Sequence, residues 1–152
     1  RARPSPPEGR VIDRSLEVEA RLDSLRAIGA WLAETAREGG LPYETAFALD
    51  LAVHEAVENA VRHGSRGEGG RVRLRLRGDD ERVEVVVEDD GVAFDPRTLP
   101  APPVPQRLED VVPGGQGVHL MRHFTDEIRY RREEGWNVLT LVRILAPRRE
   151  GS

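Results

Sequence analysis

The sequence predicts an α+β fold, a two-layer sandwich in which helices cover one face of a mixed, mostly antiparallel sheet. Three observations support this prediction. Apolar residues, alternating with charged ones in 14–20 and 71–78, mark five candidate strands; two segments with helical periodicity follow one another directly; and four strands form two pairs joined by short polar turns. Strands joined by hairpins beside grouped helices are typical of this architecture, whereas a Rossmann unit alternates strand and helix.

The first half of the chain contains one predicted strand and two predicted helices. Residues 1–12 are proline-rich and have no apolar period, so we expect them to be disordered. Alternating apolar residues predict a strand over 14–20, and helical spacing predicts a helix over 22–40 that ends at two glycines. A second helix is predicted over 42–64, with Gly64 closing it in the C′ position.

The second half contains two predicted hairpins separated by a long loop. Strands over 71–78 and 82–89 are joined by the turn "GDDE". The following stretch has many prolines and glycines and no apolar period, and a loop of this length inside a domain is generally a lid or a binding loop. We therefore expect a lid over about 94–116, then a short helix over 118–126 and a last hairpin that turns at "REEG".

Length and composition limit the classes of protein that the chain can represent. Its 152 residues suit one domain, predicted over 13–147 with a disordered tail over 148–152. The aromatic content of 5% predicts a core of leucine, valine and alanine. The absence of cysteine excludes disulfides and thiolate catalysis, and the absence of lysine excludes a P-loop, whose phosphate-binding residue is lysine.

Charge and hydropathy bear on partners and location. The net charge is −4 and both signs are interspersed, so no basic stripe indicates a nucleic-acid partner. No apolar run approaches the roughly 18 residues of a membrane span, and no signal peptide is visible in the polar, proline-rich stretch "RARPSPPEGR". We therefore expect a cytoplasmic protein that binds neither nucleic acid nor a membrane.

The stretch "HEAVENAVRHG" places polar residues in an apolar helix. Glu55 and Asn59 are four residues apart and share a face with Ala52 and His63. The opposite flank is apolar and can face the core; it consists of Leu49, Val53, Val57 and Ala60. The sequence therefore predicts that an acid and an amide point into a shared cleft, while the alternative is an ordinary solvated helix face.

Two glycine-containing segments complete a candidate site. In "VEDDGVAFDP", Asp89 ends an apolar strand and Gly91 follows it, so the carboxylate can accept a hydrogen bond from an exocyclic amine while the glycine allows a ligand to approach the backbone. In "PGGQGVHLMRHF", three glycines precede a helix whose N-terminus can bind phosphate. The alternatives are an acidic hairpin turn and a flexible hinge.

In this order and spacing, the three segments resemble the N, G1 and G2 boxes of the GHKL ATPase superfamily, with its Bergerat ATP-binding fold. The chain is most similar to the bacterial anti-sigma factor serine/threonine kinases and their histidine-kinase-like ATPase relatives, over residues 13–145. This resemblance implies ATP and Mg²⁺ as cofactors. It implies that Asn59 coordinates Mg²⁺ and that Glu55 acts as general base.

The resemblance also assigns the remaining site residues. Asp89 would read the adenine amine, Gly91 and Ala93 would lie against the base, and Thr140 would help to hold it. The lid residues would wrap the phosphates; they are Gly114, Gly115, Gly117 and Val118. The chain departs from the common pattern at Ala93, where many relatives have a second glycine.

Several histidines and one arginine have alternative interpretations. His54 either orients Glu55 or lies on the helix flank, and we favour the flank. A zinc-protease interpretation of "HEAVE" is disfavoured because Glu58 occupies the second ligand position. His119 and His123 are spaced like a metal pair, but we favour a partly exposed helix face, and Arg122 could contact a phosphate or a partner.

The predicted function is that of an ATP-binding anti-sigma factor with serine/threonine kinase activity. Its expected partners are a sigma factor, an anti-anti-sigma protein of the STAS type and a second copy of itself in a homodimer. The alternative is a nucleotide-binding regulatory module of a larger bacterial signalling protein with weak or no kinase activity. The catalytic domain of a sensor histidine kinase is disfavoured, because the chain leaves no room for the helical pair that presents the phospho-accepting histidine.

Overall fold

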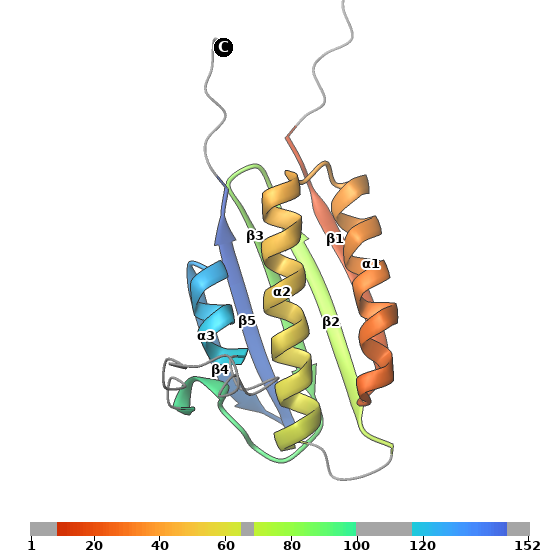
Figure 1. Cartoon of the computed structure of the whole chain (residues 1–152), viewed down its shortest axis with the longest axis vertical. Coiled ribbons are helices and arrows are strands. Elements are labelled where there is room, and N and C mark those ends of the chain that lie inside the picture. Colours follow the sequence, from red (N-terminus) through yellow and green to blue (C-terminus); the bar gives the residue numbers. More distant parts are fainter. Residues whose placement is uncertain (1–8, 65–68, 100–116, 146–152) are drawn as a thin grey trace, which may run out of the picture.

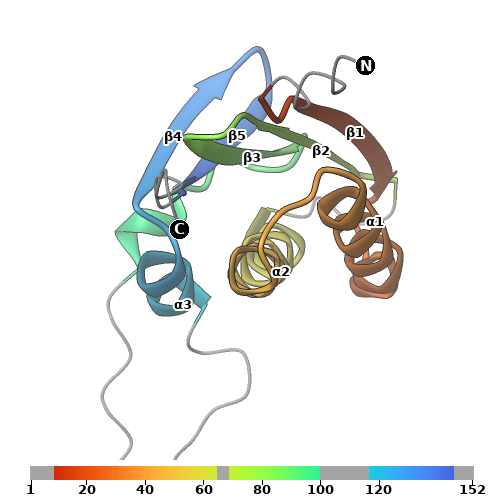
Figure 2. The ribbon, with the colours of Figure 1, turned by 90° about the horizontal axis from the view of Figure 1, so that it is seen from above.

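The computed structural model describes residues 9–64, 69–99 and 117–145. Within these residues, a five-stranded sheet with the order β1-β2-β3-β5-β4 forms one layer, and all of its strand pairs are antiparallel. Three described α-helices lie together against one face of the sheet (Figures 1 and 2). The predicted two-layer α+β fold and the predicted order of elements are confirmed.

The bounds of the elements agree with the predicted ranges to within a few residues. The strands are β1 (Ile12–Glu19), β2 (Arg71–Gly78), β3 (Arg82–Asp89), β4 (Glu127–Glu133) and β5 (Trp136–Ile144). The helices are α1 (Leu25–Glu38), α2 (Tyr43–Asn59) and α3 (Gly117–Phe124). Short helical turns are η1 (Leu22–Ser24), the π-helical η2 (Ala60–Gly64) and η3 (Pro96–Thr98).

Order begins earlier than the sequence predicted. Ile12 was assigned to a disordered segment, but it starts β1 and is 5% exposed in the core. The side chain of Arg10 donates hydrogen bonds to the backbone carbonyls of Gly39 and Gly40 at 2.8 and 2.7 Å. These contacts join segments far apart in the sequence, so the apolar pattern of the segment itself could not reveal them.

The helix end and both turns follow the predicted local chemistry. Gly40, with φ of 65°, ends α1 in a Schellman motif, in which Leu41 N–H donates to the Ala36 carbonyl. Between β2 and β3, the Asp79 side chain accepts the N–H groups of the turn. The turn between β4 and β5 has positive φ at Glu134 and Gly135, as a tight hairpin with primed geometry requires.

The end of α2 differs from the prediction. The α-helix ends at Asn59 and continues as a π-helical turn to Gly64, which does not have the positive φ of a C′ glycine. Gly64 is buried, and its carbonyl accepts a hydrogen bond from the N–H of Val92 at 2.7 Å. A Cβ at Gly64 would lie 3.0 Å from Asp89 Oδ1, so close packing explains the glycine here.

Helix α2 is the central helix of the layer, with α1 on one side and α3 on the other (Figure 2). The core beneath it is mostly valine, leucine and alanine, as the composition predicted. Val53 and Val57 are fully buried, and so is Ala52. Because α1 and α3 flank α2, more of the circumference of α2 is buried than the sheet alone would cover. In the part of the chain that is described, no helix is both long and apolar enough to span a bilayer.

Candidate active site

Two polar side chains of α2 have buried atoms without hydrogen-bond partners. Asn59 is only 5% exposed, although it is an amide beside the core. Glu55 Oε2 and Asn59 Nδ2 are buried and make no hydrogen bond within the described residues. A buried polar atom without a hydrogen bond lowers the stability of the fold by about 1–3 kcal/mol, so a contribution to stability does not explain why these two residues are here. Their placement, one helical turn apart, fits residues that meet a ligand.

The surroundings of Glu55 increase its basicity. Burial raises the pKa of the Glu55 carboxyl above its ordinary value, and the Glu58 carboxylate raises this pKa further. Arg62 and His54 act in the opposite direction, and Arg62 is itself ion-paired with Glu58. A raised pKa makes a carboxylate a stronger proton acceptor, which is the property that a general base requires.

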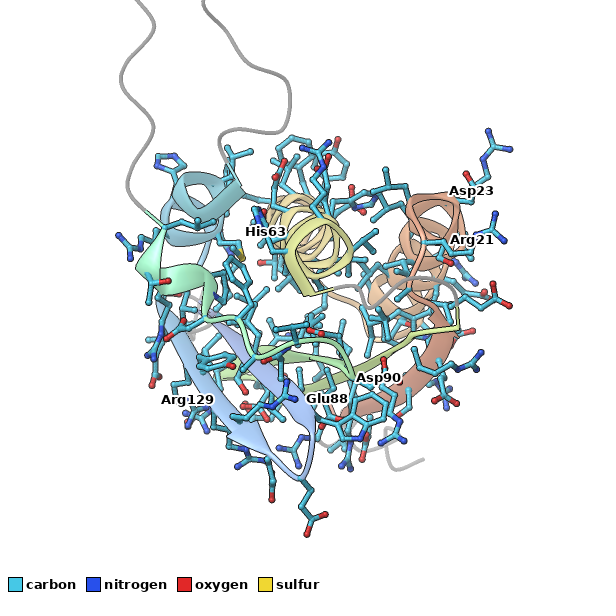
Figure 3. The ribbon with its side chains drawn as sticks, turned by 90° about the horizontal axis from the view of Figure 1, so that it is seen from below. Arg21, Asp23, His63, Glu88, Asp90 and Arg129 are labelled. Carbon is cyan, nitrogen blue, oxygen red and sulfur yellow. The ribbon has the colours of Figure 1, made fainter. Side chains whose placement is uncertain are left out.

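Asp89 lies where β3 ends, at the same end of the molecule as the last turns of α2. It is 8% exposed, and its Oδ1 accepts hydrogen bonds from the Gly91 N–H at 3.1 Å and from Asn137 Nδ2 at 3.0 Å. Burial raises the pKa of its carboxyl, against the lowering effect of these two hydrogen bonds. Figure 3 views this end of the molecule, with His63 and Asp90 labelled nearby. Oδ2 of Asp89 makes no hydrogen bond with the described residues, which leaves it available to a ligand.

Asn59 and Asp89 line the same small cavity. Its volume is about 20 Å³, and Phe94 and Pro96 from the loop after β3 also line it, while Glu55 does not. That volume is sufficient for a water molecule, whereas ligand pockets measure roughly 300–1,000 Å³. Phe94 is further held by stacking on His63, with ring centroids 4.7 Å apart. The cavity between Asn59 and Asp89, as the described residues form it, is therefore smaller than a nucleotide.

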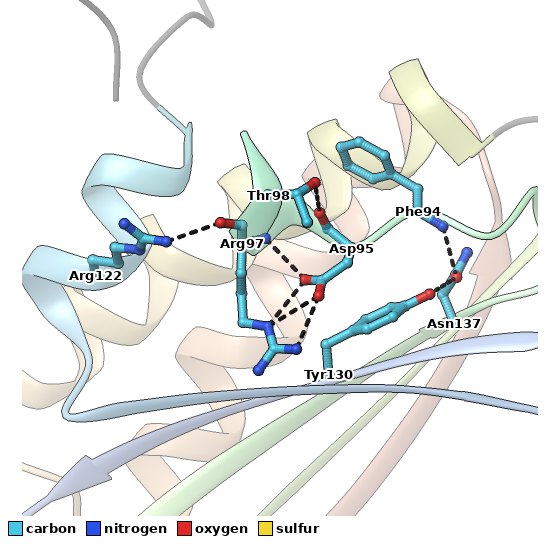
Figure 4. A network of polar contacts seen from close by, with 7 residues as sticks. All are labelled: Phe94, Asp95, Arg97, Thr98, Arg122, Tyr130 and Asn137. Atoms are coloured by element: carbon cyan, nitrogen blue, oxygen red, sulfur yellow. Dashed lines mark hydrogen bonds and ion pairs between the residues drawn. The ribbon is translucent and has the colours of Figure 1, made fainter. Parts of the chain in front are cut away.

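Asn137 is a site residue that sequence reasoning missed. It is 3% exposed, and its Nδ2 donates to both Asp89 Oδ1 and the Val92 carbonyl. Its Oδ1 accepts hydrogen bonds from Phe94 N–H and from the Tyr130 hydroxyl (Figure 4). Asn137 therefore fixes both the Asp89 carboxylate and the loop over the cavity. The available signal was an amide at a core-facing position of the apolar strand "WNVLTLV".

Replacing Asn137 by alanine is expected to lower both stability and nucleotide affinity. The substitution leaves the Val92 carbonyl, the Phe94 N–H and the Tyr130 hydroxyl without this partner. At about 1–3 kcal/mol for a group left unpaired, thermal denaturation should show a Tm lower by roughly 5–10 °C. Thr140→Val, on the opposite face of the same strand, is the control and should leave ATP affinity unchanged. An Asn137→Ala protein with wild-type Tm and affinity would contradict this role.

Thr140 does not join the other predicted residues. In β5 the side chains alternate, so Asn137 and Leu139 line the cavity with Asp89, whereas Thr140 faces the outer side of the sheet. There it lies beside Val86 and Arg129, its partners on the neighbouring strands. The structure therefore separates Thr140 from the candidate site by the thickness of the sheet, and we replace it with Asn137.

The loop residues Ala93 and Gly91 have different surroundings. Ala93 is exposed and does not line the cavity. Gly91 is buried, and a Cβ there would lie 1.8 Å from the Gly64 carbonyl oxygen. Glycine is thus required at position 91 because two backbone segments are in contact there. This contact joins the end of α2 to the corner after β3. This contact places the Asn59 and Asp89 ends of the site next to each other.

Gly91→Ala is expected to be strongly destabilising. The clash is with backbone, which cannot rotate away as a flexible side chain could, so the loss should reach or exceed the upper end of the usual 1–3 kcal/mol for overpacking, or roughly 6–12 °C in Tm. The control is Gly135→Ala, where no atom lies within 4 Å and only the φ of 85° is unfavourable, at about 1 kcal/mol. Equal losses for the two variants in thermal denaturation would contradict this explanation.

The predicted phosphate-binding glycines are only partly within the described residues. Gly114 and Gly115 lie outside them, as does most of the predicted lid. Gly117 is the first residue of α3, and Val118 follows it in the same helix. Helix α3 lies beside α2 (Figure 2), so its N-terminus belongs to the same layer as Glu55 and Asn59.

The remaining sequence candidates have structural partners. His54 lies on the flank of α2 as favoured, where Nδ1 is 2.8 Å from the Asp50 carbonyl of its own helix. Arg122 donates to the Arg97 carbonyl at 3.0 Å and so ties α3 to η3 (Figure 4). Within the described ranges, no cluster of three or more histidine or acidic side chains is arranged to hold a metal ion. The side chain of His119 lies outside the description.

Comparison with known proteins identifies the family of the chain. The model of the histidine kinase-like ATPase domain matches residues 18–143. The chain belongs to the histidine kinase-like ATPase family. The matched region includes α2, the Asp89 corner and all of β5 but its last residue, and hence Glu55, Asn59 and Asn137. The family predicted from the three motifs is confirmed.

Several relatives of this histidine kinase-like ATPase are named kinases. The serine/threonine-protein kinase BtrW of Bordetella bronchiseptica is 37% identical over 118 residues, which cover 77% of this chain and 83% of the relative. The serine-protein kinase RsbW of Bacillus pumilus is 30% identical over 130 residues, covering 81% and 80% of the two chains. The solved RsbU and RsbW domains of Rv1364c from Mycobacterium tuberculosis match with a TM-score of 0.58 and 25% identity, over 88% of this chain and 33% of that one.

Proposed function

We propose that this chain is an ATP-dependent protein serine/threonine kinase that acts as an anti-sigma factor. The observation that carries the proposal is a pair of buried atoms, Glu55 Oε2 and Asn59 Nδ2, that have no hydrogen-bond partner among the described residues. They lie one turn apart, at the end of the sheet where Asp89 Oδ2 likewise makes no hydrogen bond within the described part of the chain. The similarity to BtrW and RsbW, both named serine or serine/threonine kinases, supports the protein substrate.

Different site residues would contact the adenine and the phosphate ends of the nucleotide. Asp89 Oδ2, which bonds to none of the described residues, would accept a hydrogen bond from the adenine amine, while Asn137 and Gly91 keep the carboxylate oriented through Oδ1. Glu55 would accept the proton of a substrate serine or threonine hydroxyl as its oxygen bonds to the γ-phosphorus of ATP and ADP leaves. Its raised pKa suits that transfer.

Magnesium fits the residues present. Mg²⁺ prefers oxygen ligands and retains waters, so a single protein amide together with phosphate oxygens is a suitable donor set. Asn59 would supply the oxygen; its side chain is buried, and its amide nitrogen has no hydrogen-bond partner within the described residues. When bound, the ion would neutralise charge that develops on the phosphates. The amide's buried position would hold it in one orientation for that contact.

The partners follow from the proposed role. The chain would sequester a sigma factor and phosphorylate a serine or threonine of a STAS-domain antagonist, and it would work in the cytoplasm as a homodimer. Relatives named RsbW and BtrW support this assignment. Sedimentation of the purified chain at micromolar concentration tests whether it is a dimer. A dimer should have a mass near twice the monomer's 17.0 kDa.

A transfer assay tests the kinase activity and separates it from simple nucleotide binding. Purified chain, γ-labelled ATP and Mg²⁺ are incubated with a purified STAS-domain protein, and label in that protein is measured. Transfer that requires Mg²⁺ and a serine or threonine of the STAS protein is the expected result. ATP binding without transfer to any STAS partner of the host would instead indicate a regulatory nucleotide-binding module.

A further inference from the structure

A groove runs between the outer sides of α1 and α2, away from the sheet. Its volume is about 670 Å³. Figure 2 shows these two helices side by side on the same face of the sheet. Small residues line it on both walls, and at Gly29 an added Cβ would come within 3.3 Å of the His54 ring. Small side chains allow another helix to approach closely, at the 8–10 Å axial distance of packed helices.

One wall of this α1–α2 groove presents large aromatic side chains to solvent. Tyr43 is 84% exposed and Phe47 49% exposed, and their rings stack with centroids 6.4 Å apart. Phe47 also meets Phe124 of α3 edge-on, so its position is fixed on two sides. Exposed aromatic rings beside an apolar groove are typical of protein interaction surfaces.

The other wall ends in two arginines without partners. Arg26 and Arg37 are exposed and line the groove, and neither guanidinium makes an ion pair or hydrogen bond with the described residues. They are eleven residues apart on α1, which is three turns and about 16 Å along one face. The α1 residues that line the groove between these two arginines are small or apolar: Gly29, Ala30, Leu32, Ala33 and Ala36.

We propose that the α1–α2 groove binds an amphipathic helix of a partner protein. Its apolar side chains would pack on Phe47 and the alanines, and two of its carboxylates, about three turns apart, would pair with Arg26 and Arg37. A second copy of this chain fits less well, because symmetric pairing through the groove places the same arginine-bearing face of α1 against itself. Neither Glu55 nor Asp89 lines the groove, so the inference does not depend on the proposed kinase function.

The probe is a helix-stapled synthetic peptide with leucines at three- and four-residue spacing and two glutamates eleven positions apart. Its binding to the full chain is measured by fluorescence anisotropy. Arg26→Glu and Arg37→Glu should each weaken binding about tenfold or more. The matched control is Arg82→Glu, because Arg82 is also exposed and without an ion-pair partner among the described residues but lies on the outer face of the sheet.

Two further variants make the test independent of general charge effects. A peptide with arginines in place of its glutamates should bind the Arg26→Glu/Arg37→Glu double variant as tightly as the original peptide binds the wild type. Ala33→Trp, at an exposed position of the groove, should abolish binding without changing charge. ATP affinity and Tm should stay at wild-type values in each variant, which separates this proposal from the kinase assignment.

Two results would overturn the proposal. One is a failure of charge specificity: the wild type binds the glutamate and arginine peptides equally, or Arg82→Glu weakens binding as much as Arg26→Glu and Arg37→Glu do. The other is a dimer of the chain that sedimentation shows to dissociate on Ala33→Trp substitution, because a second copy would then occupy the groove.

Discussion

Replacing Glu55 by alanine is expected to slow phosphoryl transfer by about 10²–10⁴-fold, the usual contribution of a general base. ATP binding should persist, because Glu55 does not line the cavity shared by Asn59 and Asp89. Single-turnover transfer to the STAS partner and equilibrium ATP titration measure the two effects. Glu34→Ala is the control and should retain transfer, because Glu34 is an exposed acid of α1 that neither acts on the Glu55 pKa nor lines the cavity. Undiminished transfer by Glu55→Ala would rule out the role of base.

The pH dependence of the same residue provides a second measurement. Transfer should rise with pH through a midpoint above the ordinary Glu value of 4.5, because only the ionised carboxylate accepts a proton and burial raises its pKa. In the ligand-free protein, the stabilising contribution of this raised pKa is present below the unfolded-state value and is lost as pH rises through the folded-state pKa. Glu55→Gln should therefore raise Tm by roughly 1–3 °C at pH 7 and change it little at pH 4.

Replacing Asn59 by alanine is expected to remove the Mg²⁺-dependent part of ATP binding. Residues that merely support a metal ligand contribute 10–100-fold to metal affinity, so loss of a direct ligand should weaken Mg²⁺-ATP at least about 100-fold. ATP titrations with Mg²⁺ and with EDTA measure this directly: the wild type should differ between the two conditions, and Asn59→Ala should not.

The Tm of the Asn59→Ala variant distinguishes loss of the metal ligand from misfolding. Among the described residues, Asn59 Nδ2 has no hydrogen-bond partner to lose, so the alanine variant should keep a wild-type Tm in the absence of nucleotide. Asp89→Asn, which retains the shape of the side chain, should weaken adenine nucleotides while preserving the effect of Mg²⁺. If the Mg²⁺ effect survives in Asn59→Ala, another ligand holds the ion and the assignment fails.

The strand that carries Asn137 and Thr140 shows where sequence reasoning stops. A run of apolar residues identifies the strand, and its period of two divides the side chains into two faces. Which face meets the helices depends on the register with β3, where Asp89 pairs with Asn137 and Val86 with Thr140. Because a shift of one residue exchanges the faces, the local pattern of "WNVLTLV" could not decide between them.

Gly64 and Gly91 illustrate the same limit for glycines. Local rules predicted a helix-ending glycine and a glycine that admits a ligand, whereas the structure places the two backbones against each other. Schellman closure at Gly40 and the positive φ at Gly135 followed the rules, since those turns depend only on neighbouring residues. Glycines in contact across the fold require the tertiary arrangement to be interpreted.

The sequence by itself determined the family, the five strands and three helices, and the candidacy of Glu55, Asn59 and Asp89, because periodicity, turn chemistry and motif order are local properties of the chain. Only the tertiary structure decided that Asn137 orients Asp89, that Thr140 faces the other way, and that α1 and α2 leave an arginine-flanked groove between them. These features arise from strand register and helix packing, which join residues far apart in the sequence, so no window along the chain contains the information.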